Sequence, residues 1–366
     1  MTRPEPSIAS ATLDAFFIFE VADTIDLAAV GRSMSAQPAP LRPRAPLSAG
    51  SIRFAVPPLL VGLPPIEVAG RAGTVAAKIF DFGVVSVRFA FPYAGSWEGF
   101  AALASELRHA DDLPALSRRL LDELLATCAA ALDEPHAPLL EDYFICTVER
   151  FDEAVTAAAL LSEHRGALAA LLLAESAELG VEAQSDALRL SFSYYPDDLV
   201  VVLWDAAFVY ENRDDAEVIH DLLEFANSQL VEFRTYDARL DGELDTIYAM
   251  ETSGKNAFGP FRRRTADARA EQLRYLMVDV RELADRASNA LKIIGDAYYA
   301  RIYRGIASRL GIEDWQRQIE SKLDSVGEVY RYLIDQAQIA RSEFLEIIVI
   351  VLIAIEIIVG IVGLRR

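Results

Sequence analysis

Residues 74–91, TVAAKIFDFGVVSVRFAF, are the clearest indication of the fold in the first half of the chain. Apolar and polar residues alternate on both sides of Asp81-Phe82-Gly83, which predicts a β-hairpin or a bent strand. Other strands are predicted over 11–21, 142–151 and, as a pair, within 187–206; helices are predicted over 25–34, 96–108, 113–132 and 153–174. We therefore expect residues 1–212 to form an α+β domain with a largely antiparallel sheet.

Composition limits the classes of function. A proline-rich stretch at 37–50 is predicted to be an extended surface loop rather than a docking peptide. The 366 residues carry a formal net charge of −20, so most of the surface would repel a nucleic-acid backbone. Cys128 and Cys146 form no CxxC motif, and we expect both to be buried and reduced. Residues 1–17 show no pattern of a secretory signal.

The pattern is helical from about Asp214 onward. A first long helix is expected to end at the glycines and Pro260 within 251–261. Two later helices place apolar residues at alternating spacings of four and three, and the last keeps this spacing over nine positions from Ile319 to Ile347. Such spacing is typical of a coiled coil. Residues 213–343 are therefore predicted to form a long antiparallel helical hairpin or coiled coil.

The tail at 344–364, FLEIIVIVLIAIEIIVGIVGL, is apolar on nearly all sides of a helix. Its length of about 31 Å matches a hydrocarbon core of about 30 Å, which predicts one C-terminal transmembrane helix, with a buried core helix as the alternative. A carboxylate at Glu356, near the middle, would be protonated, paired or directed at another helix. One face combines glutamates with small residues and is expected to be the contact of a homo-oligomer: Glu346, Glu356, Gly360 and Gly363.

The densest positive cluster lies in the turn after the first long helix and includes two aromatic residues: Lys255, Phe258, Phe261, Arg262, Arg263 and Arg264. The predicted helix lengths place this turn near the membrane surface, where basic and aromatic residues bind anionic lipid. The alternative is an exposed hairpin tip with no membrane role. With the cluster facing the cytoplasmic leaflet, we expect a tail-anchored, single-pass protein of the inner (cytoplasmic) membrane, its bulk on the cytoplasmic side.

Two motifs carry a resemblance to a family. Leu345-Glu346, the aliphatic run after it and Glu356 resemble the C-terminal signature of the uncharacterised membrane family named after the yeast protein required for meiotic nuclear division. IFDFGVVSVRFAF at 79–91 is similar to a strand motif of that family. The chain departs from it at Ile347, where the family usually has tryptophan, and over 175–212. The resemblance implies a bacterial member with an α+β domain, a helical hairpin and one span. It also implies, by analogy with mitochondrial members, a link to translation at the membrane.

No catalytic motif is found. Asp81-Phe82-Gly83 lacks the other parts of a kinase site and is interpreted as a turn. The acidic pairs are interpreted as helix caps and turns: Asp111-Asp112, Asp197-Asp198 and Asp214-Asp215. The histidines share no metal-ligand spacing, and each is interpreted as a lone surface residue: His109, His136, His164 and His220. We expect no catalytic residue, no cofactor, no metal site and no enzymatic activity.

These features predict a membrane-anchored, homo-oligomeric scaffold whose α+β domain binds a partner protein on the cytoplasmic side. Its expected partners are membrane lipid, other copies of itself and a protein, without direct binding of nucleic acid. Two alternatives remain open: an oligomeric ion channel or pore that uses Glu356, and an enzyme with an unrecognised site.

Overall fold

The computed structural model describes residues 5–35, 54, 56–68, 70–253, 271, 274–283, 285 and 294–364. The chain forms two compact units, each assembled from two segments. The first unit comprises Met1–Thr235 and Arg286–Trp315, and the second comprises Tyr236–Asp285 and Gln316–Arg366. Two helices, α7 (Arg213–Ser253) and α10 (Ile312–Leu364), contribute residues to both units.

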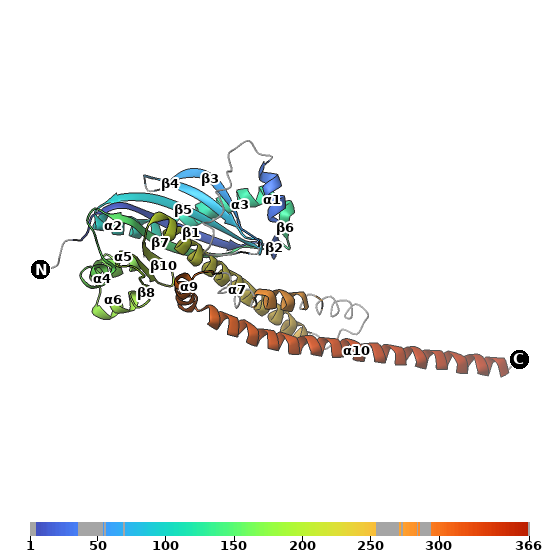
Figure 1. Ribbon diagram of the computed structural model, residues 1–366. Helices are drawn as coiled ribbons and strands as arrows, with labels where there is room; N and C mark the ends of the chain where they lie inside the picture. The colour runs from blue at the N-terminus through green and yellow to red at the C-terminus, as the bar shows by residue number, and fades with distance from the viewer. Residues whose placement is uncertain are drawn as a thin grey trace. The chain divides into compact units, whose positions relative to one another are not determined.

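The first unit is built on an eight-stranded sheet of order β3-β4-β5-β1-β7-β10-β9-β8 (Figure 1). Neighbouring strands are antiparallel except for β7 and β10, which are parallel. The N-terminal part is thus α+β with a large mixed sheet. Its strands are β1 (Ile8–Glu20), β3 (Leu59–Val68), β4 (Arg71–Ile79), β5 (Val84–Gly95), β7 (Leu139–Phe151), β8 (Ser191–Phe192), β9 (Leu199–Val202) and β10 (Ala206–Tyr210); β2 (Thr24–Ile25) and β6 (Leu132–Asp133) pair separately.

One face of the sheet packs against short helices. Successive side chains of a strand point to opposite faces, and on β1 the residues Leu13, Ala15, Phe17 and Phe19 belong to the apolar core on this side. The helices of this layer are α1 (Leu27–Ser35), α2 (Trp97–Arg108), α3 (Asp112–Cys128), α4 (Ala157–Ser162), α5 (Arg165–Leu173) and α6 (Val181–Ala187). The single helix predicted over 153–174 is therefore divided into α4 and α5. Cys128 and Cys146 are buried and free, as predicted.

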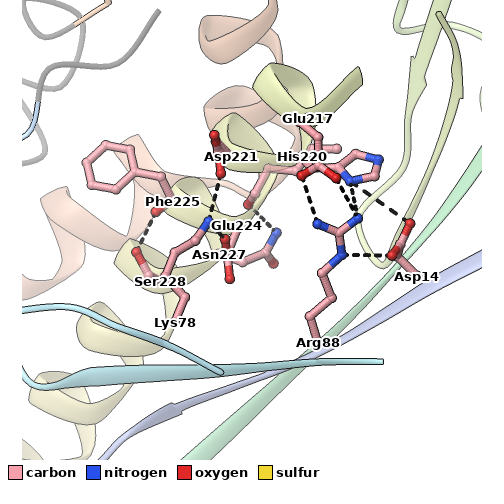
Figure 2. A network of polar contacts seen from close by, with 11 residues as sticks. Asp14, Lys78, Arg88, Glu217, His220, Asp221, Glu224, Phe225, Asn227 and Ser228 are labelled. Carbon is pink, nitrogen blue, oxygen red and sulfur yellow. Dashed lines mark hydrogen bonds and ion pairs between the residues drawn. The ribbon is translucent and has the colours of Figure 1, made fainter. Parts of the chain in front are cut away.

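The opposite face of the sheet carries α7 (Figures 1 and 2). The helix α9 (Ala297–Arg309) lies against α7, because the Tyr303 hydroxyl donates to Gln229 and its ring centroid is 6.0 Å from that of Phe225. From Ala216 to Thr235, α7 is consequently buried on nearly all sides. A helix in such a position is usually apolar all round, but this one carries many polar residues.

Of the two structures predicted over 74–91, a β-hairpin or a bent strand, the hairpin is the one that forms. Strands β4 and β5 pair antiparallel, and Phe80 N donates to Val84 O at 2.9 Å across the turn. Gly83 has φ +87°, and a Cβ at this position would lie 1.8 Å from the carbonyl oxygen of Ala22. The turn therefore requires glycine, both for its backbone conformation and for the space beside it.

The coiled coil predicted over 213–343 is wrong, because the described helices form no coiled coil. In the second unit, Lys322 on α10 lies 2.6 Å from Asp237 and 2.7 Å from Asp241, both on α7. The first residues of the expected seam, Ile319 and Leu323, are already buried within the single chain. Spacings of four and three also describe the buried side of an ordinary helix, which is what α10 shows here.

The transmembrane helix predicted over 344–364 is also wrong, and with it the tail-anchored, single-pass location at the inner membrane. Among the described residues, no helix is long and apolar enough to cross a membrane. Residues 344–364 are the last part of α10, one helix of 53 residues that starts at Ile312. Glu346 and Glu356 interrupt the apolar run, and a charged side chain near the centre of a bilayer costs about 2.5–3.5 kcal/mol.

We expect Gly83→Ala to lower the free energy of unfolding by at least about 2 kcal/mol, because alanine at this position combines backbone strain with a clash. Gly62→Ala on β3 is the matched control, since no heavy atom lies within 4 Å of its Cβ position. Urea unfolding of both variants measures the difference. Equal unfolding midpoints would contradict this account of the turn.

Candidate functional site

The residues predicted from the sequence to be functional do not come together in one site. Glu346 is exposed on α10, and Glu356, Gly360 and Gly363 lie further along the same helix. The residues predicted to form the membrane-surface loop lie outside the described part of the chain: Lys255, Phe258, Phe261, Arg262, Arg263 and Arg264.

A network of charged side chains lies between the sheet and α7 (Figure 2). Asp14 comes from β1, Lys78 from β4 and Arg88 from β5, and each is a lone charge within an apolar part of its strand. Four residues of α7 meet them at spacings of three and four, so they share one side of the helix: Glu217, His220, Asp221 and Glu224.

Lys78 forms two ion pairs with α7. Its Nζ lies 2.7 Å from Asp221 Oδ1 and also pairs with Glu224. Burial opposes the charge of Lys78, but attraction by the two carboxylates is stronger and raises its pKa. Burial raises the pKa of Asp221 to about 6 although Lys78 opposes the rise. Lys78 and Asp221 are therefore both charged at pH 7.

Arg88 joins three side chains. Its Nε donates to Asp14 Oδ1 at 2.7 Å, its Nη1 to Glu217 Oε2 at 2.9 Å, and its Nη2 lies 3.0 Å from Nδ1 of His220. A guanidinium only donates, so Nδ1 accepts, and the ring hydrogen is on Nε2, which donates to Thr147 Oγ1 at 2.8 Å. Burial, reinforced by Arg88, lowers the pKa of His220 to about 4, so the imidazole is neutral at pH 7.

Thr147, His220 and Asp14 resemble a nucleophile with its base but cannot act as one. A base must present an unprotonated nitrogen to the nucleophile, whereas His220 donates to Thr147. All three side chains are buried.

The ion pairs of the network hold α7 on the sheet. Removing one member of such a buried ion pair costs about 3–5 kcal/mol, because its partner is left uncompensated.

The interpretation of all four histidines as surface residues is wrong for His220 and His164, which are buried. For His220 the reason is that both ring nitrogens have partners on strands of the sheet, Arg88 on β5 and Thr147 on β7. The network left a signal in the sequence, because Asp14, Lys78 and Arg88 each interrupt a strand whose neighbouring positions are apolar. A buried charge is rarely left without a partner.

An acidic hollow of about 410 Å³ opens where β7 ends and α7 begins. It is lined by one arginine, Arg150, and by six carboxylates: Glu149, Asp152, Glu153, Asp197, Asp198 and Glu211. Burial raises the pKa of Glu211 to about 7, and Asp198 and Asp215 add to the rise against a hydrogen bond from the backbone of Asn212. The hollow thus has a surplus of negative charge that a cation would neutralise.

A platform of three tyrosines borders this hollow, and we name Tyr194, Tyr195 and Tyr298 the tyrosine platform. Tyr194 and Tyr195 are 64% and 63% exposed. The ring of Tyr194 lies edge-on to Tyr195 at 4.8 Å and to Tyr298 at 5.2 Å. The buried carboxylate of Asp198 accepts from Tyr194 N and Tyr195 N, each at 2.7 Å. Asp198 therefore fixes the turn that presents the two exposed rings.

Comparison with known proteins identifies relatives of the N-terminal part of the chain. The family model described as "Uncharacterized protein MJ0711, N-terminal domain" matches residues 10–217. The uncharacterized protein MJ0711 of Methanocaldococcus jannaschii is 22% identical over 242 residues, which are 66% of this chain and 72% of the relative. The region matched by the family model runs from β1 to the first turn of α7 and includes the exposed tyrosines Tyr194 and Tyr195.

The resemblance to the membrane family named after the yeast protein required for meiotic nuclear division is wrong, because the family that matches is a different one. The motifs that suggested it were a glutamate-flanked aliphatic run and an alternating strand. Both are short apolar patterns that helices and buried strands of unrelated proteins share. The implied link to translation has no further support.

We expect His220 to make the protein less stable as the pH falls from 6.5 towards 4. Its pKa is lowered to about 4 in the fold, so the unfolded chain binds the proton first, and the loss approaches roughly 3 kcal/mol. His220→Gln keeps a donor for Thr147 and an acceptor for Arg88 but does not titrate. Asp221 titrates in wild type and in His220→Gln alike. The pH dependence of the difference between their unfolding free energies therefore reports the titration of His220 alone. A difference that stays constant across this pH range would contradict the neutral assignment.

Proposed function

This chain belongs to the family of the N-terminal domain of the uncharacterized protein MJ0711, and we propose that it is a scaffold without enzymatic activity whose α+β unit binds a partner protein. The partner presents a basic segment, and the binding surface is the tyrosine platform together with the acidic hollow. The observation that carries this proposal is the pair of exposed tyrosines held by the buried carboxylate of Asp198.

Exposed aromatic side chains on a fixed turn suit protein recognition. Tyrosine contributes a large contact area at low cost in conformational entropy, and aromatic residues supply much of the binding energy at protein interfaces. The backbone under Tyr194 and Tyr195 is held by two hydrogen bonds to Asp198. The platform therefore requires little reordering when a partner binds, which favours affinity.

Charge and ring chemistry favour a cationic partner. The guanidinium of Arg301 already lies 5.3 Å from the centroid of Tyr298, so the platform accepts a cation over an aromatic ring within the chain itself. The carboxylates of the hollow lie beside it. With a net charge of −20, the protein attracts basic proteins at long range and repels nucleic acid.

An enzyme that uses Glu211 is the second candidate. A carboxyl group with a pKa of about 7 in a hollow suits general acid–base catalysis. The scaffold is favoured because Glu211 is surrounded by other carboxylates, and the pair most similar to a nucleophile and base, Thr147 and His220, is sealed under α7. A pore lined by Glu356 would need a membrane-spanning helix, which none of the described helices provides.

We expect a fluorescein-labelled, arginine-rich peptide to bind the full chain, and Tyr194→Ala/Tyr195→Ala to raise its Kd about tenfold by removing cation–π contacts. Trp204→Ala is the matched control, because Trp204 is 68% exposed in the turn between β9 and β10 but does not belong to the platform. Fluorescence anisotropy measures both. The same Kd for wild type and the double variant would refute the platform as the binding surface.

Binding of this peptide should weaken severalfold between pH 8 and pH 6. The pKa of Glu211 is raised to about 7, so this carboxyl takes up a proton over the interval and loses its attraction for a cation. Glu211→Gln should bind about as weakly at pH 8 as wild type does at pH 6. Glu175→Gln, a change at an exposed residue outside the hollow, should keep the wild-type dependence. If peptide binding by Glu211→Gln had the same pH dependence as that of wild type, Glu211 would have no part in binding the peptide.

A further inference from the structure

The largest exposed apolar surface among the described residues lies on α10. Eight large aliphatic side chains are 39–59% exposed there. We name them the aliphatic collar: Ile348, Val349, Ile350, Val351, Leu352, Ile353, Ile355 and Ile357. Glu346, two residues before the collar begins, is exposed as well.

The collar surrounds the helix. Successive residues of an α-helix lie about 100° apart, so residues 348–351 already point in four directions, and Leu352, Ile353, Ile355 and Ile357 add further positions around the helix. A surface helix normally exposes polar residues on one side and buries an apolar stripe on the other. Exposed aliphatic side chains in several directions instead call for neighbours on more than one side.

The area of the collar matches that of a protein interface. Eight half-exposed aliphatic side chains present on the order of 700 Å² per chain, close to the roughly 800 Å² that each partner buries in a stable complex. The other exposed large apolar side chains among the described residues are single or in pairs: Val56, Val181, Trp204, Tyr194 with Tyr195, and Tyr275 with Val278. Within the described part of the chain, the surface that complements the collar in length and chemistry is the collar itself.

We propose that copies of this chain associate through their aliphatic collars, which pack side by side. Identical segments bring equal lengths of apolar surface, and several copies can cover more than one side of each helix. The advantage of assembly, several tyrosine platforms in one particle, rests on the proposed scaffold function, whereas the contact itself uses a separate surface.

Light scattering during size-exclusion chromatography of the full chain tests the association. We expect wild type to have at least twice the mass of one chain, which is 40.3 kDa. Leu352→Glu/Ile355→Glu places charges in the collar and should return the mass to that of one chain. Val181→Glu, at an aliphatic residue of α6 that is 76% exposed, is the matched control and should keep the wild-type mass. Circular dichroism checks that the variants remain helical.

A wild-type chain with the mass of one chain at micromolar concentration would overturn the proposal, and so would a double variant that stays associated. Wild type with the mass of one chain that binds phosphatidylcholine vesicles would assign the collar to a lipid surface instead. Peptide binding by the double variant separates the two proposals. A dissociated double variant that still binds the arginine-rich peptide supports both proposals. A wild-type chain that associates but does not bind the peptide would leave the collar contact and refute the platform.

Discussion

The ion pairs that Lys78 and Arg88 form with α7 are the interaction on which the first unit depends. From Ala216 to Thr235 this helix is buried on nearly all sides, and its polar groups would be costly without partners. Some bond within the helix, as Asn227 does to Leu223 O at 2.9 Å. Glu217, Asp221 and Glu224 instead pair with the two cations of the sheet. A slide of α7 by one turn, about 5.4 Å, would separate every pair, so the network sets the register of the helix.

The sealed network and the open hollow are connected through the start of the same helix. Glu211, which lines the hollow, is two residues before Arg213, the first residue of α7. Because the network holds the following turns against the sheet, it also fixes where Glu211 lies relative to the tyrosine platform. The buried charges therefore hold α7 in place on the sheet, whereas the carboxylates of the hollow are available to a binding partner. A rigid support of this kind is what a preformed binding surface needs.

The features that could be predicted from the sequence are those that depend on residues close together in the chain. The β4–β5 hairpin follows from alternation around a glycine turn, and the buried cysteines follow from their apolar surroundings. The lone charges of the strands indicate that partners exist, but the pairing itself could not be predicted, because Lys78 and Asp221 are 143 residues apart. The tail was misjudged for another reason. An aliphatic run has the same composition whether it contacts lipid or another helix, so hydropathy alone cannot distinguish the two.

The two edges of the sheet determine whether copies that are held close together can add strands to one another. The edge strand β3 contains Pro64 and Pro65 where its register with β4 shifts, and the other edge, β8, has only two residues. Proline has no N–H to donate and is tolerated in edge strands, where it blocks further pairing. Crowding raises the local concentration of every exposed strand. Neither edge offers a long template for adding a strand, so an assembly held by its helices avoids growing into a fibre through its sheets.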